Sequence, residues 1–257
     1  MRPVGSAEYK ARQFLVKHAA PLGFRLVSGI ANVAKTRVRR SMAVESYVRG
    51  EGLEVGAGAA PAIVPRGARV KYVDKYPIEF LRSDPELAHL DFSAPDIVAP
   101  AETLAPVADK SQDFVLAFSL FEHVQDPLST LQNFCRVTRP GGVLVLSVPD
   151  RRRYGPDKPR PVTPFEHFVR DYREGPAVSV REHFDEVGRT WHQLSGDELT
   201  RFVEDSVRTD LHCHFHVWES ETFLGFVLAA REVIGVEYEL LEMAAYGVET
   251  LVVLRVR

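Results

Sequence analysis

Short apolar runs alternate with stretches of helical spacing along most of the chain. Four of these runs, residues 53–55, 69–74, 113–118 and 143–148, have the length and apolar content of buried strands. Nearly continuous apolar strands separated by helices are typical of a parallel sheet that is covered on both faces. The pattern therefore predicts an α/β fold, Rossmann-like and doubly wound, with a mostly parallel sheet.

The best-defined helix is expected between the third and fourth strands. Asp126 can cap its first turn and Pro127 can occupy that turn. Apolar side chains follow at helical spacing, and Pro140 with two glycines ends the helix before the next strand. The end of the chain predicts four further elements: a strand over 210–218, a helix over 219–233, and a closing strand pair over 237–242 and 249–256.

Two segments depart from this alternation. Residues 1–48 carry many basic side chains among apolar ones and predict a basic helical arm ahead of the main domain, 49–257. Such an arm can lie on an anionic membrane, hold an anionic substrate, or form a helical layer with a solvated basic face. Residues 151–210 are rich in Arg, Pro, Asp and His, which indicates an insertion or lid over the carboxyl edge of the sheet.

Composition narrows the class of protein without naming a function. The 257 residues are 45% hydrophobic and 26% charged, and a formal net charge of -3 gives no general attraction to nucleic acid. No apolar run reaches the roughly 18–20 residues that span a bilayer, and no signal peptide is recognisable at the start. Cys135 and Cys213 lack metal-ligand spacing. These features favour a soluble protein of the reducing cytoplasm, and no feature indicates an oligomeric state.

The strongest chemical signal follows the first strand, in Glu54-Val55-Gly56-Ala57-Gly58. Two glycines one residue apart allow a sharp turn and the close approach of a ligand to the backbone. Pro61 stands where a nicotinamide-dinucleotide fingerprint needs its third glycine, and the short stretch that follows leaves little room for a pyrophosphate-binding helix. Glu54 would repel a pyrophosphate but attract a cofactor that carries a cationic amino group and a sulfonium. The loop therefore favours S-adenosylmethionine over NAD.

Acidic residues after later strands extend this cofactor site. Asp74 ends the second strand, where a carboxylate can accept hydrogen bonds from both ribose hydroxyls. A surface turn that includes Lys75 is the alternative. Asp96 and Ile97 are candidates for flanking an adenine, with Asp96 accepting from its amino group, and a plain turn is again the alternative.

These residues, with others along the chain, resemble the class I S-adenosylmethionine-dependent methyltransferases. The resemblance covers roughly residues 50–150 and rests on motifs in family order and spacing: Glu54-x-Gly56-x-Gly58, Asp74, Asp113-Phe114-Val115, Phe121-Glu122-His123-Val124-x-Asp126-Pro127 and Arg139-Pro140-Gly141-Gly142. Flanking stretches, 72–74, 161–167 and 214–218, look like a bacterial subgroup often linked with sugar or glycan modification.

The resemblance implies roles for particular residues. The glycine loop and Ser119 would line the methionine and ribose part of S-adenosylmethionine, Asp74 would hold the ribose, and the Asp96 region would border adenine. Two departures weaken the adenine contacts: the glycine loop lacks a normal following helix, and Ala99-Pro100 stands where related sequences tend to carry an acid. The implied cofactor contacts are Glu54, Gly56, Ala57, Gly58, Asp74, Lys75, Asp96, Ile97 and Ser119.

Methyl transfer from a sulfonium requires alignment of the acceptor and exclusion of water, and an alcohol acceptor also requires a base. His123, just beyond a strand's carboxyl end, is the first candidate base, with packing under the cofactor loop as the alternative. His167 and His214 are further catalytic candidates, on the expectation that the insertion folds over the cleft.

Other polar residues are candidates for substrate binding. Asp150 follows the fourth strand, and Arg153 and Arg160 belong to a basic cluster that suits an anionic acceptor or forms a solvated loop. His214 and His216 alternate with His212, so on a strand all three would share one face that serves the substrate, a base or structure alone. Nothing else in the sequence demands a metal ion on that face, and none is expected.

The sequence therefore favours an S-adenosylmethionine-dependent methyltransferase that acts on a small molecule or glycan. A sugar hydroxyl is the favoured acceptor, and an amine is the chemical variant. The alternative from another class is a cofactor-binding protein without catalysis that acts through its basic arm as a membrane-associated assembly factor. Turnover would distinguish the two, because a binding protein would release no S-adenosylhomocysteine.

Overall fold

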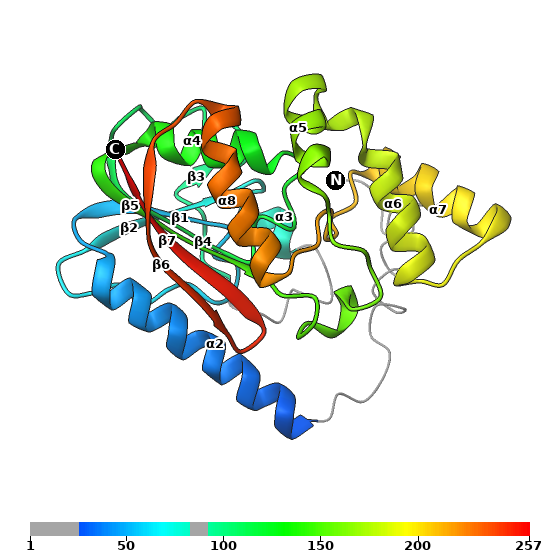
Figure 1. Ribbon diagram of the computed structural model, residues 1–257, viewed down its shortest axis with the longest axis horizontal. Helices are drawn as coiled ribbons and strands as arrows, with labels where there is room; N and C mark the ends of the chain where they lie inside the picture. Colours follow the sequence, from blue (N-terminus) through cyan, green and yellow to red (C-terminus); the bar gives the residue numbers. More distant parts are fainter. Residues whose placement is uncertain (1–25, 83–91) are drawn as a thin grey trace.

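The computed structural model describes residues 26–82 and 92–257, which contain one seven-stranded sheet in the order β3-β2-β1-β4-β5-β7-β6 (Figure 1). Strands β1 to β5 are parallel, whereas β7 runs antiparallel to both β5 and β6. The first five strands follow the order of doubly wound dinucleotide-binding folds, which confirms the predicted fold class. The strands are β1 Glu51–Val55, β2 Arg69–Asp74, β3 Ile97–Val98, β4 Gln112–Phe118, β5 Thr138–Pro149, β6 Tyr238–Tyr246 and β7 Glu249–Val256.

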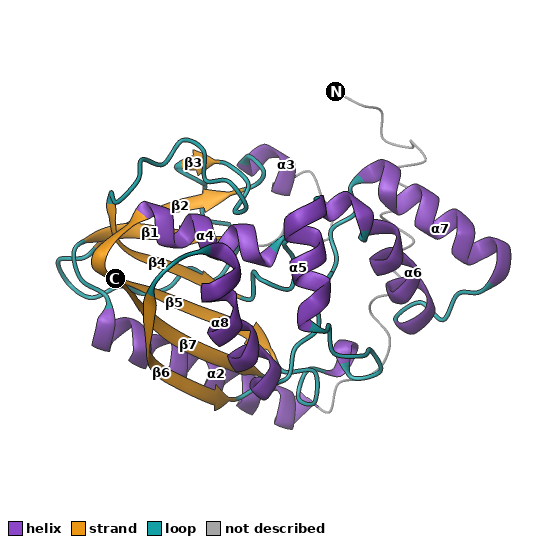
Figure 2. Ribbon diagram, turned by 45° about the horizontal axis from the view of Figure 1, so that its top comes forward, coloured by secondary structure: helices purple, strands orange, loops and turns teal. Residues whose placement is uncertain are grey.

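Helices cover both faces of this sheet. In Figures 1 and 2, α4 and α8 lie on one face and α2 on the other, while α5, α6 and α7 lie beyond one end of the strands. The helices are α2 Leu26–Tyr47, α3 Ile78–Arg82, α4 Pro127–Val137, α5 Phe165–Glu174, α6 Val180–Thr190, α7 Gly196–Thr209 and α8 Ser220–Ile234, with short 3-10 turns at Gly155–Asp157 and Pro176–Val178.

Most elements agree with the sequence pattern. The Asp126 side chain accepts a hydrogen bond from the Ser129 amide and caps α4, as expected. The predicted helix over 219–233 is α8, and the predicted closing pair is the antiparallel β6–β7 hairpin, which is longer than expected. Strand β5 also begins earlier than predicted, directly after α4.

Alternation along the strands explains why the sheet needs cover on two sides. In β4, Val115 and Ala117 join the core beneath α4 and α8. Phe114, Leu116 and Phe118 join the core beneath α2. Successive strand residues face opposite sides, and burial of one such large side chain stabilises the fold by about 1.5–3 kcal/mol. The near-continuous apolar strands therefore require both helical layers.

The segment predicted as an insertion, 151–210, is largely helical. Its helices α6 and α7 enclose a small separate core with the chain that follows them, which includes Phe184, Phe202 and Phe215. The amide of Phe215 donates to the carbonyl of Glu122 at 2.6 Å, so this region is fastened to the loop after β4. The domain boundaries themselves stay a prediction.

The predicted strand over 210–218 is wrong. This segment is extended without a ladder, and Trp218 makes only an isolated bridge to Asp150. Its amides at Phe215 and His216 both turn to the Glu122 carbonyl instead of a strand partner. The three alternating histidines consequently do not share one face. His214 lies with His123, whereas His216 lies with two histidines of the insertion.

The predicted helical arm is described only from residue 26 onward, as α2, and residues 1–25 lie outside the described residues. Two of its basic side chains are only partly exposed and form ion pairs. Arg39 pairs with Glu242 and Arg40 pairs with Glu249, so both bind α2 to the hairpin. In the described part of the chain, no helix combines the length and apolar character that crossing a bilayer requires.

We expect Gly52→Ala to lower the free energy of unfolding by about 3 kcal/mol, at the upper end of the usual cost of overpacking. A Cβ at Gly52 in β1 would stand 2.2 Å from the carbonyl oxygen of Phe114, its partner in β4. Urea unfolding measures the change. The matched control is Gly225→Ala in α8, where a Cβ meets no described atom within 4 Å, so stability should rise by up to about 1 kcal/mol. Equal stability of both variants would contradict the close β1–β4 contact.

Candidate functional site

The turn after β1 is shaped by two glycines with left-handed backbone, with φ of +72° at Gly56 and +55° at Gly58. The Gly56 amide donates to the carbonyl of Val73 at 2.9 Å, and a Cβ at Gly56 would lie 3.0 Å from Leu120. Within the described residues, nothing lies within 4 Å of the Cβ position of Gly58. The loop is thus packed at its base and open at Gly58, where a ligand can approach the backbone.

Glu54 secures the far end of this loop. Both of its carboxylate oxygens lie within hydrogen-bond distance of the Ala62 amide, at 2.9 and 3.1 Å. The side chain is buried, and burial raises its pKa to about 7 against the opposing effects of the Ala62 amide and Arg40. The carboxylate therefore orders the loop from within the fold. Its predicted attraction for a cationic cofactor stays a prediction.

Glu54→Gln should change how stability depends on pH. The pKa of about 7 in the folded state lies above the ordinary 4.5, so the contribution of Glu54 is fully present below pH 4.5 and is lost as pH rises through 7. Gln keeps an oxygen for the Ala62 amide but does not titrate. Relative to the native chain, the variant should gain up to about 3 kcal/mol between pH 4.5 and 8. Urea unfolding across this range tests it, and parallel pH profiles would contradict the buried carboxyl.

Asp74 stands at the end of β2, half-buried beside the glycine loop. Its Oδ1 accepts from the Tyr76 amide at 3.1 Å, and burial raises the pKa of the carboxyl against the hydrogen bonds from the Tyr76 and Lys75 amides. Lys75 instead pairs with Asp210 at 2.6 Å, and the Tyr76 hydroxyl donates to the same carboxylate. The end of α7 is therefore fastened across the turn that carries Asp74.

The other implied cofactor contacts are partly used within the fold. Asp96 accepts from the Tyr72 amide at 2.8 Å, and Ile97 beside it packs against the core. Ser119, with φ of +52°, donates to Glu249 at 2.6 Å and accepts from Arg40 at 2.9 Å. Its side chain thus faces α2, so a cofactor would meet the backbone of Ser119 more readily than its hydroxyl.

A compact polar group lies where β4 ends. One ligand-type atom from each of Glu122, His123 and His214 lies within 4.8 Å of the others. The Glu122 carboxyl is buried, has no hydrogen-bond partner among the described residues, and burial raises its pKa well above the ordinary value. Burial, with the neighbouring His212 and His214, lowers the pKa of His123 well below its ordinary value. Burial therefore favours the uncharged forms of both side chains.

The hydrogen bonds of the two imidazoles define their free nitrogens. His123 Nδ1 lies 3.0 Å from the carbonyl of Cys213, which can only accept, so the proton is on Nδ1 and Nε2 carries a lone pair. His214 Nδ1 lies 2.7 Å from the carboxylate of Asp157. A carboxylate on Nδ1 orients an imidazole and leaves Nε2 as a proton acceptor. The His214–Asp157 pair thus has the arrangement of a general base.

Arg160 supports this pair from behind. It is fully buried, and its guanidinium donates to Asp157 at 3.2 Å, to Glu186 at 2.7 Å and to the Phe215 carbonyl at 3.3 Å. The predicted substrate contact is therefore engaged inside the protein. Asp157 was not identified from the sequence as the partner of His214, because a contact across 57 residues has no local signal.

The remaining predicted substrate contacts are placed differently. Asp150 is fully buried and accepts from Arg152 and Ser220, whose hydrogen bonds together outweigh the effect of burial and lower its pKa. Arg153 is exposed, and its guanidinium has no partner among the described residues. The basic cluster as a whole is mostly paired, because Arg151 binds Glu219 and Arg152 binds Glu221.

His167 and His216 lie together with His183 and form a second group, apart from the one at the end of β4. His183 was not singled out in the sequence. Asp171, which also contacts His167, was missed as well. Its position one helical turn after His167 is a usable signal only once residues 165–174 are recognised as a helix.

The part of the chain that carries the glycine loop and the end of β4 is similar to known proteins. A family model described as a methyltransferase domain matches residues 53–146, the stretch from β1 through most of β5. The human thiol S-methyltransferase TMT1B is 40% identical over 95 residues, 36% of this chain and 38% of that protein. A probable S-adenosylmethionine-dependent methyltransferase of Mycolicibacterium smegmatis is 38% identical over 60 residues, 23% of each chain. The matched part thus spans well under half the length of these relatives.

A crystal structure of an S-adenosylmethionine-dependent methyltransferase from Aquifex aeolicus aligns with 97% of this chain and 98% of its own, at 12% identity and a TM-score of 0.47. A likeness this remote carries no argument about function. The matched residues contain the glycine loop, Asp74 and the Glu122-His123 pair. The family match and the curated relatives therefore agree with the resemblance found in the sequence and support a class I S-adenosylmethionine-dependent methyltransferase domain over residues 53–146.

Proposed function

We propose that this chain transfers a methyl group from S-adenosylmethionine to a hydroxyl of a small molecule or glycan, with His214 as the base. The observation that carries the proposal is the His214–Asp157 pair, which faces Glu122 and His123 at the carboxyl end of β4. In open α/β sheets, ligands bind at this end, where the strand order reverses. Here that point lies between β1 and β4.

The residues around the glycine loop fit the cofactor. Gly58 leaves its backbone open to a ligand, and the half-buried Asp74 makes no ion pair with the described residues. A carboxylate at the end of β2 suits two ribose hydroxyls. When bound, S-adenosylmethionine supplies an activated methyl group on a sulfonium whose leaving group is already part of the molecule. The chain's own residues then have to orient the acceptor, exclude water and take up its proton.

Proton transfer is the task that the Glu122 group can perform. An acceptor hydroxyl placed between Nε2 of His214 and the methyl carbon would lose its proton to His214 as its oxygen forms the new bond to carbon. Asp157 would stabilise the imidazolium that results. Burial raises the pKa of Glu122 and favours its protonated form, which would offer an O–H donor that can orient the acceptor oxygen.

The surroundings favour a neutral acceptor. Most cations of the predicted basic cluster are already paired with carboxylates of the protein, which leaves little positive charge for a phosphate or carboxylate. A sugar hydroxyl fits this better than an anionic group. A hydroxyl acceptor also accounts for the His214–Asp157 pair, because a hydroxyl needs a base to remove its proton. A neutral amine attacks with its own lone pair and needs no such base.

A thiol is the second candidate acceptor, because TMT1B, named as a thiol S-methyltransferase, is 40% identical to this chain over 95 residues. A thiol has an ordinary pKa of about 8.5 and depends less on a base than a hydroxyl does. Parallel assays with sugar alcohols and small thiols separate the two. We expect turnover with a hydroxyl acceptor to require His214, whereas turnover confined to thiols and insensitive to His214 would refute the hydroxyl proposal.

Calorimetric titration with S-adenosylhomocysteine, with NAD and NADP as controls, tests the cofactor directly. We expect selective binding of S-adenosylhomocysteine at micromolar strength. Binding without release of product for any acceptor class would support the alternative, a cofactor-binding protein without catalysis. Binding of NAD instead would contradict the assignment of the glycine loop.

A further inference from the structure

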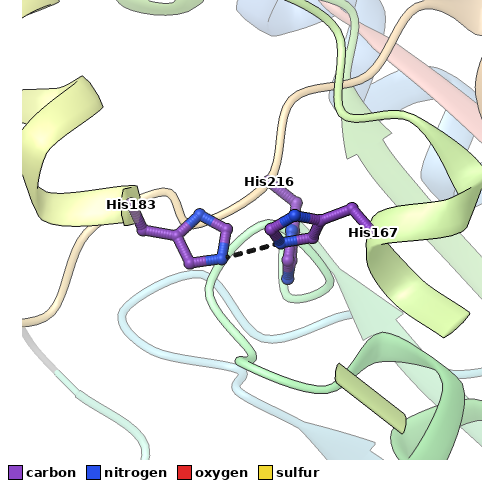
Figure 3. Close-up of side chains that lie close together, drawn as sticks. All are labelled: His167, His183 and His216. Carbon is purple, nitrogen blue, oxygen red and sulfur yellow. Dashed lines mark hydrogen bonds between the residues drawn. The ribbon is translucent and has the colours of Figure 1, made fainter. Parts of the chain in front are cut away.

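Three histidines from separate segments meet inside the helical insertion, and we call them the insertion triad: His167 of α5, His183 of α6 and His216 of the segment 211–219. Figure 3 shows their rings converging on one point, with Nε2 of His167 3.1 Å from Nε2 of His183. One ring nitrogen from each lies within 4.8 Å of the others. His183 and His216 are buried, and His167 is nearly so.

A carboxylate completes the group. Asp171 lies one turn after His167 on α5, and its Oδ2 is 3.1 Å from Nε2 of His167. The Asp171 side chain is fully buried, yet neither oxygen accepts a hydrogen bond of good geometry from the described residues. A buried carboxylate without partners is costly unless a cation compensates it.

His216 is a second buried side chain with unsatisfied polar atoms. Its ring is fully buried, and neither nitrogen makes a hydrogen bond of good geometry with the described residues, although the Gln125 carbonyl lies near it. Buried polar atoms are nearly always satisfied in native proteins. The insertion triad thus brings three ring nitrogens within 4.8 Å of one another, and the Asp171 carboxylate adjoins them at His167. The unsatisfied oxygens of Asp171 and nitrogens of His216 are atoms that bind metals.

We propose that the insertion triad and Asp171 bind one Zn²⁺ ion with four protein ligands. Imidazole nitrogen and carboxylate oxygen are zinc ligands, and a closed set of four is typical of structural sites. Bonds of about 2.0–2.1 Å in tetrahedral arrangement place ligand atoms about 3.4 Å apart. The 3.1 Å separations from His167 to His183 and to Asp171 are close to that spacing.

The surrounding contacts are of the kind that orient zinc ligands. The Phe215 carbonyl lies against the His183 ring and favours a proton on the nitrogen that faces it. Such second contacts fix the tautomer of a ligating histidine. One contact opposes the arrangement. If Nε2 of His167 binds zinc, its Nδ1 carries a proton, yet the donor Nη2 of Arg170 lies 3.4 Å from this Nδ1. This contact is long, and the shorter partner of Arg170 is Glu182 at 2.6 Å.

The proposed ion would join the parts of the molecule that carry the base. It would tie α5 and α6 to the segment 211–219, in which His216 follows His214 by two residues. The role is therefore structural, holding the insertion against the end of β4. This inference does not rest on the proposed methyl transfer, because zinc binding is measured without cofactor or acceptor.

The test is zinc stoichiometry of the full chain, purified without a histidine tag, chelated and reloaded with Zn²⁺, by elemental analysis and equilibrium titration. We expect one zinc per chain and a higher melting temperature with zinc. Asp171→Asn and His183→Gln should each weaken binding by about 100-fold or more, because each removes one ligand of a closed site. Asp171→Asn has nearly unchanged shape, which keeps the test valid where His183→Gln folds poorly.

His214→Gln is the matched control, because it alters the other histidine group and leaves all four proposed ligands intact. We expect it to keep its zinc. Loss of zinc in His214→Gln with retention in His183→Gln would place the metal at the Glu122 group and overturn the proposal. Absence of zinc binding in the native chain would overturn it too, and would mean that a shared proton joins His167 to His183.

Discussion

Replacement of His214 by Ala is expected to lower kcat by about 100- to 10,000-fold, the range by which a positioned base accelerates proton transfer. The substitution removes the nitrogen that would accept the acceptor's proton and leaves Asp157 without its partner. Affinity for S-adenosylhomocysteine should stay close to that of the native chain, because His214 lies on the segment 211–219 and not on the glycine loop. Steady-state kinetics with calorimetry separates the two effects.

Asp157→Asn tests whether the pair acts as a unit. Asn can turn its amide toward Nδ1 of His214 and so favour the tautomer with the proton on Nε2, which cannot accept another. We expect a fall in kcat in the same direction as for His214→Ala, again with little change in cofactor affinity. The two changes combined should cost about as much as the larger one alone, because they remove the same step.

His192→Ala provides the control for loss of an imidazole from the insertion. His192 belongs to neither histidine group. Its ring packs against Phe202, with 5.1 Å between the ring centroids. We expect activity close to that of the native chain. Full activity of His214→Ala over the whole pH range would remove His214 as the base and leave Nε2 of His123 as the remaining candidate at this edge.

The local structure around the residues proposed to bind the cofactor could be predicted because its signals are local. A strand followed at once by Gly56 and Gly58 requires a turn, and both glycines indeed have positive φ. Asp74 ends a strand whose bounds the apolar pattern gave without error. In a parallel sheet, the ends of such strands meet at one edge. Sequence position alone therefore places these residues together.

The other half depends on contacts that no local pattern encodes. The helices α5, α6 and α7 within 151–210 were not identified from the sequence, although each has an apolar and a polar face. Their average composition is polar, and this indicated an insertion rather than helices. The segment 211–219 turns toward Glu122, and this turn places His214 beside His123 and His216 beside His167 and His183. The hydrogen-bond partners of Glu54 and Ser119 could not be predicted either. Glu54 accepts from a backbone amide, and Ser119 donates to a carboxylate 130 residues away.

Asp74→Ala should weaken binding of S-adenosylhomocysteine by about 150-fold or more, since two hydrogen bonds to a charged group contribute roughly 1.5–3 kcal/mol each. The reason is the expected pair of bonds from the ribose hydroxyls to the carboxylate. Asp74→Asn keeps the size and one acceptor oxygen, and should fall between Ala and the native chain. Calorimetric titration gives the three affinities, with circular dichroism to confirm that each variant is folded.

A loss of affinity alone does not assign the bonds to the ribose, because Asp74 also accepts from the Tyr76 amide and helps to shape the turn. An analogue of S-adenosylhomocysteine without the 2′ and 3′ hydroxyls resolves this. The native chain should bind it far more weakly than the parent compound, whereas Asp74→Ala should bind the two almost equally, because the coupling between side chain and hydroxyls is gone. Independent, additive losses would mean that Asp74 only shapes the loop and that the ribose is held elsewhere.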